Sequence, residues 1–123
     1  MNGQTILIVD DEPEIVGLLS RVLIRQGFEV NTAQTIREGW EKLNRACPEL
    51  LFMDINLPDG NGLEELIDIK FKFPDIKVVM ISAVDIDEHR KKAIDRGAFE
   101  FLSKPFQLSQ VSDLVATLRK PEA

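Results

Sequence analysis

Cysteine and histidine are almost absent from this sequence. Cys47 is the only cysteine and His89 the only histidine. A single cysteine excludes any disulfide within the chain, and it fits a reducing compartment. The same scarcity gives no support to a zinc site, which needs several such ligands close together.

Long hydrophobic runs are also missing. No apolar stretch approaches the roughly twenty residues that span a bilayer. The apolar run at residues 6–9 is too short for a signal peptide and leads directly into Asp10 and Asp11. We therefore expect a cytoplasmic protein without a membrane segment.

Positive charge is in deficit, since 21 acidic residues stand against 15 basic ones and the formal net charge is -6. This balance argues against direct nucleic-acid binding, which needs a basic face, and against attraction to anionic membranes. The length of 123 residues, with 44% apolar and 29% charged residues, is typical of one globular domain with its own core. We expect that domain to span residues 1–119, with 120–123 as a C-terminal tail or a truncated linker.

Short apolar, β-branched runs alternate with longer amphipathic stretches. The runs occupy residues 6–9, 28–32, 50–53, 78–81 and 99–102. The first, third and fourth are almost continuously apolar, as in parallel strands that are covered on both faces, whereas the second alternates and indicates an edge strand. The pattern predicts an α/β fold of the doubly wound (βα)5 type, with a parallel sheet, right-handed crossovers and helices on both faces.

The stretches between the runs have helical spacing and helix-end signals. One example of the spacing is the third stretch, with Leu63, Leu66, Ile67 and Lys70 along one face. Thr35 with Glu38 predicts a capping box, and Asp85 with Glu88 a looser one. Other residues typical of helix ends are Pro13, Gly27 and Gly97.

Polar residues follow the predicted strands, at the edge of the sheet where such folds bind ligands. They are Asp10 and Asp11 after the first strand, Asp54 to Asn56 after the third, Ser82 after the fourth and Lys104 after the fifth. Three carboxylates, a hydroxyl and an ammonium should therefore converge on one edge. We take this clustering as the main functional signal of the sequence.

Carboxylates this close need neutralisation. Two unit charges about 5 Å apart repel by roughly 3 kcal/mol at an effective dielectric of 20. Either a proton is held at a raised pKa or a cation is bound, and Mg2+ (or Mn2+) suits carboxylate and carbonyl oxygens. With such a cation and Lys104 in place, Asp54 becomes a nucleophile toward phosphorus, and Ser82 is within reach of a phosphoryl oxygen.

Three segments resemble response regulator receiver domains of two-component signal transduction. They are residues 6–12 (ILIVDDE), 54–62 (DINLPDGNG) and 97–106 (GAFEFLSKPF). The resemblance covers essentially the whole chain with its motifs in order, and the motifs are specific only in combination. It implies a flavodoxin-like sandwich with strand order 2-1-3-4-5.

The resemblance also implies roles for individual residues. Asp54 would be the phospho-acceptor, and Lys104 would pair with the phosphoryl group and form a cis bond with Pro105. The metal would be held by Asp10, Asp11, Asp54 and the backbone carbonyl of Asn56.

Two further positions resemble the family's switch residues, Ser82 as the hydroxyl and Phe101 as the aromatic ring. Many family members carry threonine and tyrosine there. Because Phe101 has no phenolic hydroxyl, we expect its inward turn on phosphorylation to be driven by packing alone.

The implied function is that of a signalling domain, not an enzyme, which catalyses only its own metal-dependent phosphorylation and dephosphorylation. The phosphoryl group would come from a histidine kinase, a phosphotransfer protein or a small acyl phosphate. The face formed by the fourth helix, fifth strand and fifth helix would then act on an unknown output domain or partner protein, and a phosphorylation-dependent homodimer is allowed.

Three other functions compete with this interpretation. A flavodoxin-like cofactor binder would want Ser, Thr and Gly after the first strand, where Asp10 and Asp11 would repel a phosphate. An aspartyl phosphohydrolase needs a substrate cap, for which the chain has no room. A degenerate receiver that serves only as a protein–protein interaction module lacks metal binding, so metal binding distinguishes it.

Overall fold

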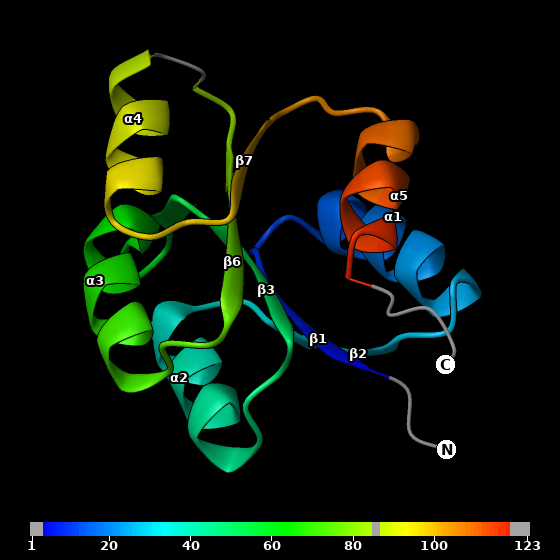
Figure 1. Ribbon diagram of the computed structural model, residues 1–123, viewed down its shortest axis with the longest axis horizontal. Coiled ribbons are helices and arrows are strands. Elements are labelled where there is room, and N and C mark those ends of the chain that lie inside the picture. The colour runs from blue at the N-terminus through cyan, green and yellow to red at the C-terminus, as the bar shows by residue number, and fades with distance from the viewer. Residues whose placement is uncertain (1–3, 85–86, 119–123) are drawn as a thin grey trace.

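A five-stranded parallel sheet forms the centre of the protein, as the computed structural model describes it for residues 4–84 and 87–118 (Figure 1). The strand order is β2-β1-β3-β6-β7. Their bounds are β1 Thr5–Val9, β2 Glu29–Ala33, β3 Leu50–Asp54, β6 Lys77–Ser82 and β7 Glu100–Ser103. Every neighbouring pair in this sheet is parallel.

The predicted fold class is confirmed, with one difference in detail. The two-residue strands β4 (Asn56–Leu57) and β5 (Gly60–Asn61) form a separate antiparallel hairpin in the loop after β3, which the sequence did not indicate. The main sheet therefore takes its fourth and fifth strands from β6 and β7. The alternating strand β2 does lie at one edge of the sheet.

Helices cover both faces of the sheet (Figure 1). On one face lie α2 (Ile36–Arg45), α3 (Gly62–Lys72) and α4 (Asp87–Asp95), and on the other lie α1 (Pro13–Arg25) and α5 (Leu108–Ala116). Each face buries its own apolar cluster, and successive residues of a strand enter opposite clusters. In β1, for example, Leu7 packs toward α2 and α3 while Ile8 packs toward α1 and α5. This two-sided burial explains why the strand runs are continuously apolar.

The helix ends agree with most of the sequence signals. Pro13 opens α1, and Gly27 and Gly97 follow α1 and α4 with φ values of 96° and 99°, where glycine carries no Cβ penalty. The Thr35 hydroxyl accepts the Glu38 N–H at 3.0 Å, as a capping residue should. The expected cap at Asp85 and the boundary at 119–120 lie outside the described residues, so both stay predictions. No described helix combines the length and the apolar character needed to cross a membrane.

The loop after β3 is fixed by two side-chain caps. Asp59 accepts the backbone N–H groups of Ile36 at 2.8 Å and Arg37 at 3.0 Å, at the start of α2. Asn61 accepts the N–H of Leu63 at 2.8 Å, at the start of α3. The two hydrogen bonds from α2 hold the pKa of Asp59 below its ordinary value. The loop thus joins the starts of two helices beside the end of β3.

We predict that Asp59→Asn lowers the melting temperature and makes it less dependent on pH. The pKa of Asp59 is lowered in the folded protein, so its stabilisation is present above the unfolded pKa and is lost as the pH falls through the folded pKa. The melting-temperature difference from wild type should therefore be largest near pH 7 and should vanish in strong acid. Thermal unfolding between pH 2 and 8 measures it. Asp68→Asn, which removes the same charge from an exposed position on α3, should show no such trend, and equal curves for the two variants would contradict the cap.

Candidate functional site

Two buried carboxylates stand at the ends of neighbouring strands. Asp54 is the last residue of β3 and Asp10 follows β1 directly, and β1 pairs with β3. Asp10 is fully buried and Asp54 is 4% exposed. The parallel register carries both strand ends to the same edge of the sheet, as the sequence predicted.

Lys104 brings a positive charge between these carboxylates from the segment after β7. Its Nζ lies 3.0 Å from Asp54 Oδ2 and 3.1 Å from Asp10 Oδ2, and it also donates a hydrogen bond to Glu12 Oε1. The backbone N–H of Lys104 donates to Ser82 O at 2.8 Å, which ties the end of β7 to the end of β6. The Lys104–Pro105 peptide bond is cis, the isomer that the resemblance implies.

Burial and charge set the protonation behaviour of this group. Burial raises the pKa of both Asp10 and Asp54 above the ordinary value, and the hydrogen bonds and charge that each receives only partly offset it. Burial also works against the Lys104 ammonium, but its hydrogen bonds to Glu12 and Asp54 outweigh that effect, so the pKa of Lys104 is raised. The lysine stays charged at neutral pH. The two aspartates, in contrast, bind a proton or a cation more readily than an ordinary carboxylate does.

The donor set fits a hard divalent cation. Carboxylate oxygens of Asp10, Glu12 and Asp54 lie within 4.8 Å of one another. Asp10 Oδ2 is buried, and its close cationic neighbour is the Lys104 ammonium at 3.1 Å. One ammonium shared among three carboxylates neutralises them incompletely, and Mg2+ or Mn2+ would supply the missing positive charge.

This carboxylate group differs in membership from the predicted one. Asp11 is exposed and lies outside the group of three, while Glu12, which the sequence analysis did not single out, lies within it. The predicted roles of Asp11 and of the Asn56 carbonyl in metal binding stay predictions. Asn56 contributes its backbone N–H, which donates to Asp54 Oδ1 at 3.2 Å. Glu12 was detectable only from its position two residues after Asp10, whose Oδ1 accepts the Glu12 N–H at 2.8 Å.

Glycine allows the loop after β3 to return against Asp54. A Cβ on Gly62 would lie 2.3 Å from the Asp54 carbonyl oxygen, far inside contact distance. The Gly62 N–H donates to Ile55 O at 2.7 Å in the same turn. Any larger residue at this position would push the start of α3 away from the site.

Ser82 lies at the end of β6 and is fully buried. Its hydroxyl donates to Val84 O at 3.0 Å and accepts the Val84 N–H at 3.0 Å. The hydroxyl is therefore engaged with the loop that leads to α4, and Ser82 lies next in β6 to Ile81, the register partner of Asp54.

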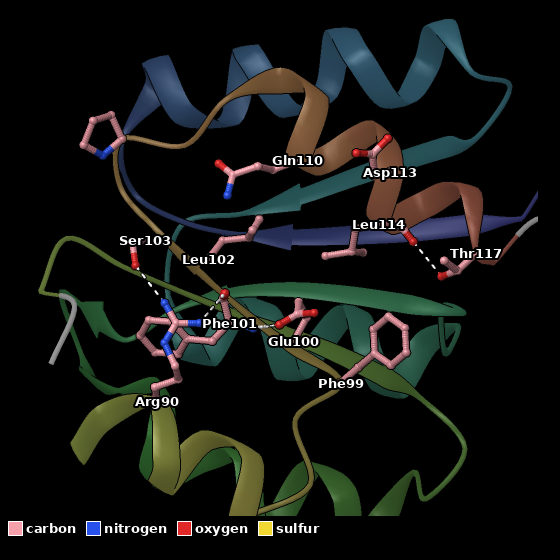
Figure 2. A pocket seen from close by; sticks show the side chains of 11 residues that line it. Arg90, Phe99, Glu100, Phe101, Leu102, Ser103, Gln110, Asp113, Leu114 and Thr117 are labelled. Atoms are coloured by element: carbon pink, nitrogen blue, oxygen red, sulfur yellow. Dashed lines mark hydrogen bonds between the residues drawn. The ribbon is translucent and has the colours of Figure 1, made fainter. Parts of the chain in front are cut away.

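Phe101 in β7 is 3% exposed and packs in the cluster beneath α2, α3 and α4. The ring thus already faces the core, whereas we had expected an inward turn on phosphorylation. Figure 2 shows Arg90 of α4 stretched across this ring, with its guanidinium carbon 4.8 Å from the ring centroid. Arg90 also donates to Phe101 O at 3.4 Å and to Ser103 Oγ at 3.3 Å.

A groove of about 620 Å3 lies beside this contact and opens between α4, β7 and α5 (Figure 2). Its lining includes Arg90 from α4, Phe99 before β7, Glu100 in β7, and Gln110 and Asp113 from α5. The predicted output face is thus a concave surface that carries positively charged, negatively charged and aromatic side chains.

Comparison with known proteins gives consistent matches. The family model of the response regulator receiver domain matches residues 6–116. The response regulator protein PilR of Pseudomonas aeruginosa is 40% identical over an alignment of 126 positions, which covers 100% of this chain and 28% of that protein. The chemotaxis protein CheY of Thermotoga maritima is 33% identical over 119 residues, which is 96% of this chain and 99% of that protein. The chain therefore spans about a quarter of PilR but nearly all of CheY.

A solved structure agrees with these sequence matches. The solution structure of the beryllofluoride-activated NtrC4 receiver domain dimer superposes with a TM-score of 0.88 at 34% identity. The superposition covers 92% of this chain and 93% of that chain.

We predict that Asp10→Asn raises the melting temperature in metal-free buffer at pH 7, by at least about 3 °C for each kcal/mol of repulsion that is removed. The pKa of Asp10 is raised in the folded protein, so its charge destabilises the fold at neutral pH, and this penalty disappears as the pH falls below the unfolded pKa. The increase in melting temperature caused by Asp10→Asn should therefore become smaller as the pH is lowered. Thermal unfolding with a chelator present measures both.

Asp11→Asn is the matched control, because it removes an equal charge from the exposed neighbouring position. It should leave the melting temperature almost unchanged. A lower melting temperature for Asp10→Asn at pH 7 would contradict the view that its buried charge is only partly compensated.

Proposed function

The chain belongs to the family of response regulator receiver domains, and from this premise we propose that Asp54 accepts a phosphoryl group in a reaction that requires Mg2+ or Mn2+. The observation that carries the proposal is the buried Asp54 carboxylate, held 3.0 Å from the Lys104 ammonium and grouped with Asp10 and Glu12. Few other chemistries use a buried nucleophilic carboxylate beside a fixed ammonium and a hard-cation site.

Each residue has a role in this transfer. A carboxylate oxygen of Asp54 attacks the phosphorus of an acyl phosphate or a phosphohistidine, and the bond to the leaving group breaks as that group takes the electron pair. Lys104 binds a phosphoryl oxygen and neutralises its charge. Asp10, Asp11, Asp54 and the Asn56 carbonyl would hold the cation, which supplies further neutralisation of the phosphoryl oxygens when bound.

Ser82 would couple this event to the output face. Its hydroxyl now donates to Val84 O. A phosphoryl oxygen on Asp54 is a stronger, charged acceptor than a backbone carbonyl, so the hydroxyl would turn toward it. That change releases Val84 and the loop before α4.

The helix α4 is suited to respond, because Ala93 is its one buried residue among those described. Arg90 supplements this weak anchorage through its contacts with Phe101 and Ser103 on β7. A segment with few buried contacts can shift at low cost. We infer that phosphorylation changes the position of α4 relative to β7 and α5, and that a partner recognises this change.

This surface would act on an output domain or partner protein, with a histidine kinase or phosphotransfer protein as the phosphoryl donor. A phosphorylation-dependent homodimer is also proposed, since the related NtrC4 receiver forms a dimer when activated. Catalysis is limited to the domain's own phosphorylation and dephosphorylation, and its expected location is the cytoplasm. The presence of Asp10, Asp54 and Lys104 in one pocket favours this function over a degenerate interaction module.

We predict that incubation with Mg2+ and acetyl phosphate adds the mass of one phosphoryl group to the wild type and none to Asp54→Ala. The reason is that Asp54 is the proposed nucleophile, and its Oδ2 lies 3.0 Å from the Lys104 ammonium that would bind the phosphoryl oxygen. Intact-mass spectrometry with and without metal makes the measurement. Asp68→Ala, an exposed acid on α3, should be labelled like wild type. Labelling of Asp54→Ala, or full labelling without metal, would refute the proposal.

We further predict that Ser82→Ala is still phosphorylated but transmits less to the output face. Without the hydroxyl, phosphorylation has no Ser82–Val84 hydrogen bond to break. The change in the amide chemical shifts of Arg90 and Phe101 on phosphorylation should therefore fall to about half or less of the wild-type change. Two-dimensional NMR before and after phosphorylation compares the variants. Ser20→Ala on α1, across the sheet from α4, should behave as wild type. If phosphorylation changes the amide chemical shifts of Ser82→Ala as much as those of wild type, the coupling through Ser82 is ruled out.

A further inference from the structure

The Lys104 ammonium has three carboxylate partners, and the proposed transfer explains only two of them. Asp10 and Asp54 are parts of the buried pocket, whereas Glu12 reaches Lys104 from the surface. The Glu12 side chain is 55% exposed and that of Lys104 is 9% exposed. Glu12 therefore lies at the mouth of the pocket, over the group that must receive a phosphoryl oxygen.

The backbone of Glu12 is held by hydrogen bonds near the start of α1, whereas its carboxylate is held by Lys104. Its N–H donates to Asp10 Oδ1 at 2.8 Å, and its carbonyl accepts the N–H groups of Ile15 and Val16 at 3.1 Å each, at the start of α1. Its side chain makes no capping hydrogen bond to that helix. Within the described part of the chain, the Glu12 carboxylate accepts its hydrogen bond from Lys104, so neutralising it removes no helix cap.

We propose that Glu12 is a positioning residue that holds the Lys104 ammonium in the pocket and competes with the phosphoryl group for it. This inference rests on the proposed function. Three carboxylates surround the ammonium, so an incoming phosphoryl oxygen competes with them for its charge and its donors. Glu12 is the partner that leaves, because it is the exposed one and water can solvate its carboxylate afterwards.

Two consequences with opposite signs follow from this position. Neutralising Glu12 removes the competitor and lowers the negative charge that a phosphoryl anion meets, so the anion binds more tightly. The same change removes one of the three clustered carboxylates, so the divalent cation alone binds more weakly. A purely structural role for Glu12 would not move the two affinities in opposite directions.

The test uses the full chain as wild type, Glu12→Gln and Glu14→Gln. Glu14 is the matched control, since it is an exposed acid in the first turn of α1. Calorimetry measures the affinity for Mg2+ alone. At saturating Mg2+, beryllofluoride affinity and the rate of phosphorylation by acetyl phosphate are measured. For Glu12→Gln we expect weaker Mg2+ binding, but beryllofluoride affinity and phosphorylation rate about two- to fivefold higher than in wild type, the range for one partly exposed ion pair.

Each outcome decides the matter. Weaker Mg2+ binding together with tighter beryllofluoride binding in Glu12→Gln, with little change of either affinity in Glu14→Gln, supports the competition. Unchanged or weaker beryllofluoride binding in Glu12→Gln overturns it, and an equal gain in Glu14→Gln assigns the effect to net charge and overturns it as well. If wild type itself takes up neither beryllofluoride nor a phosphoryl group, the proposed function falls and this inference with it.

Discussion

One residue, Lys104, links the ends of four strands through its ammonium, its backbone N–H and its place in the chain. Its Nζ lies between Asp10 after β1 and Asp54 at the end of β3. Its backbone N–H binds Ser82 at the end of β6, and Lys104 itself follows β7. Two like charges without this cation would be very costly to bury. The parallel sheet makes the arrangement possible, since it gathers the carboxyl ends of its strands at one edge.

The sequence predicted this framework because its signals are local. Continuous apolar runs mark strands that are covered on both faces, and the alternating run of β2 marks an edge strand. Within such a fold, an acid placed directly after a buried strand can lie only at the ligand-binding edge. The positions of Asp10, Asp54 and Lys104 at or directly after the ends of their strands therefore predict that these residues meet at this edge.

Other features depend on contacts that no local pattern encodes. Asp59 caps α2 across more than twenty positions of sequence, and Glu12 meets Lys104 from the other end of the chain. The two-residue strands of the hairpin are too short to show a period. Helical spacing also misplaced Ile67, which is 52% exposed, because spacing identifies a face but does not say whether a neighbour covers its rim. Side-chain pairs between distant elements were thus the part that sequence could not supply.

The two helix layers are anchored unequally, and in the proposed switch this inequality would decide which layer responds. On one face, α1 and α5 pack on each other and are joined by the Gln26–Ser112 hydrogen bond over a shared apolar cluster. On the other face, α4 buries only Ala93 among its described residues and relies on Arg90 for polar contacts with β7. In the proposed switch, a change at Ser82 would act first through Val84, on the side of the weaker layer. For the proposed function, the buried pocket and the weakly anchored helix would therefore be complementary: the pocket would fix where the phosphoryl charge is added, and α4 would be the element that moves at least cost.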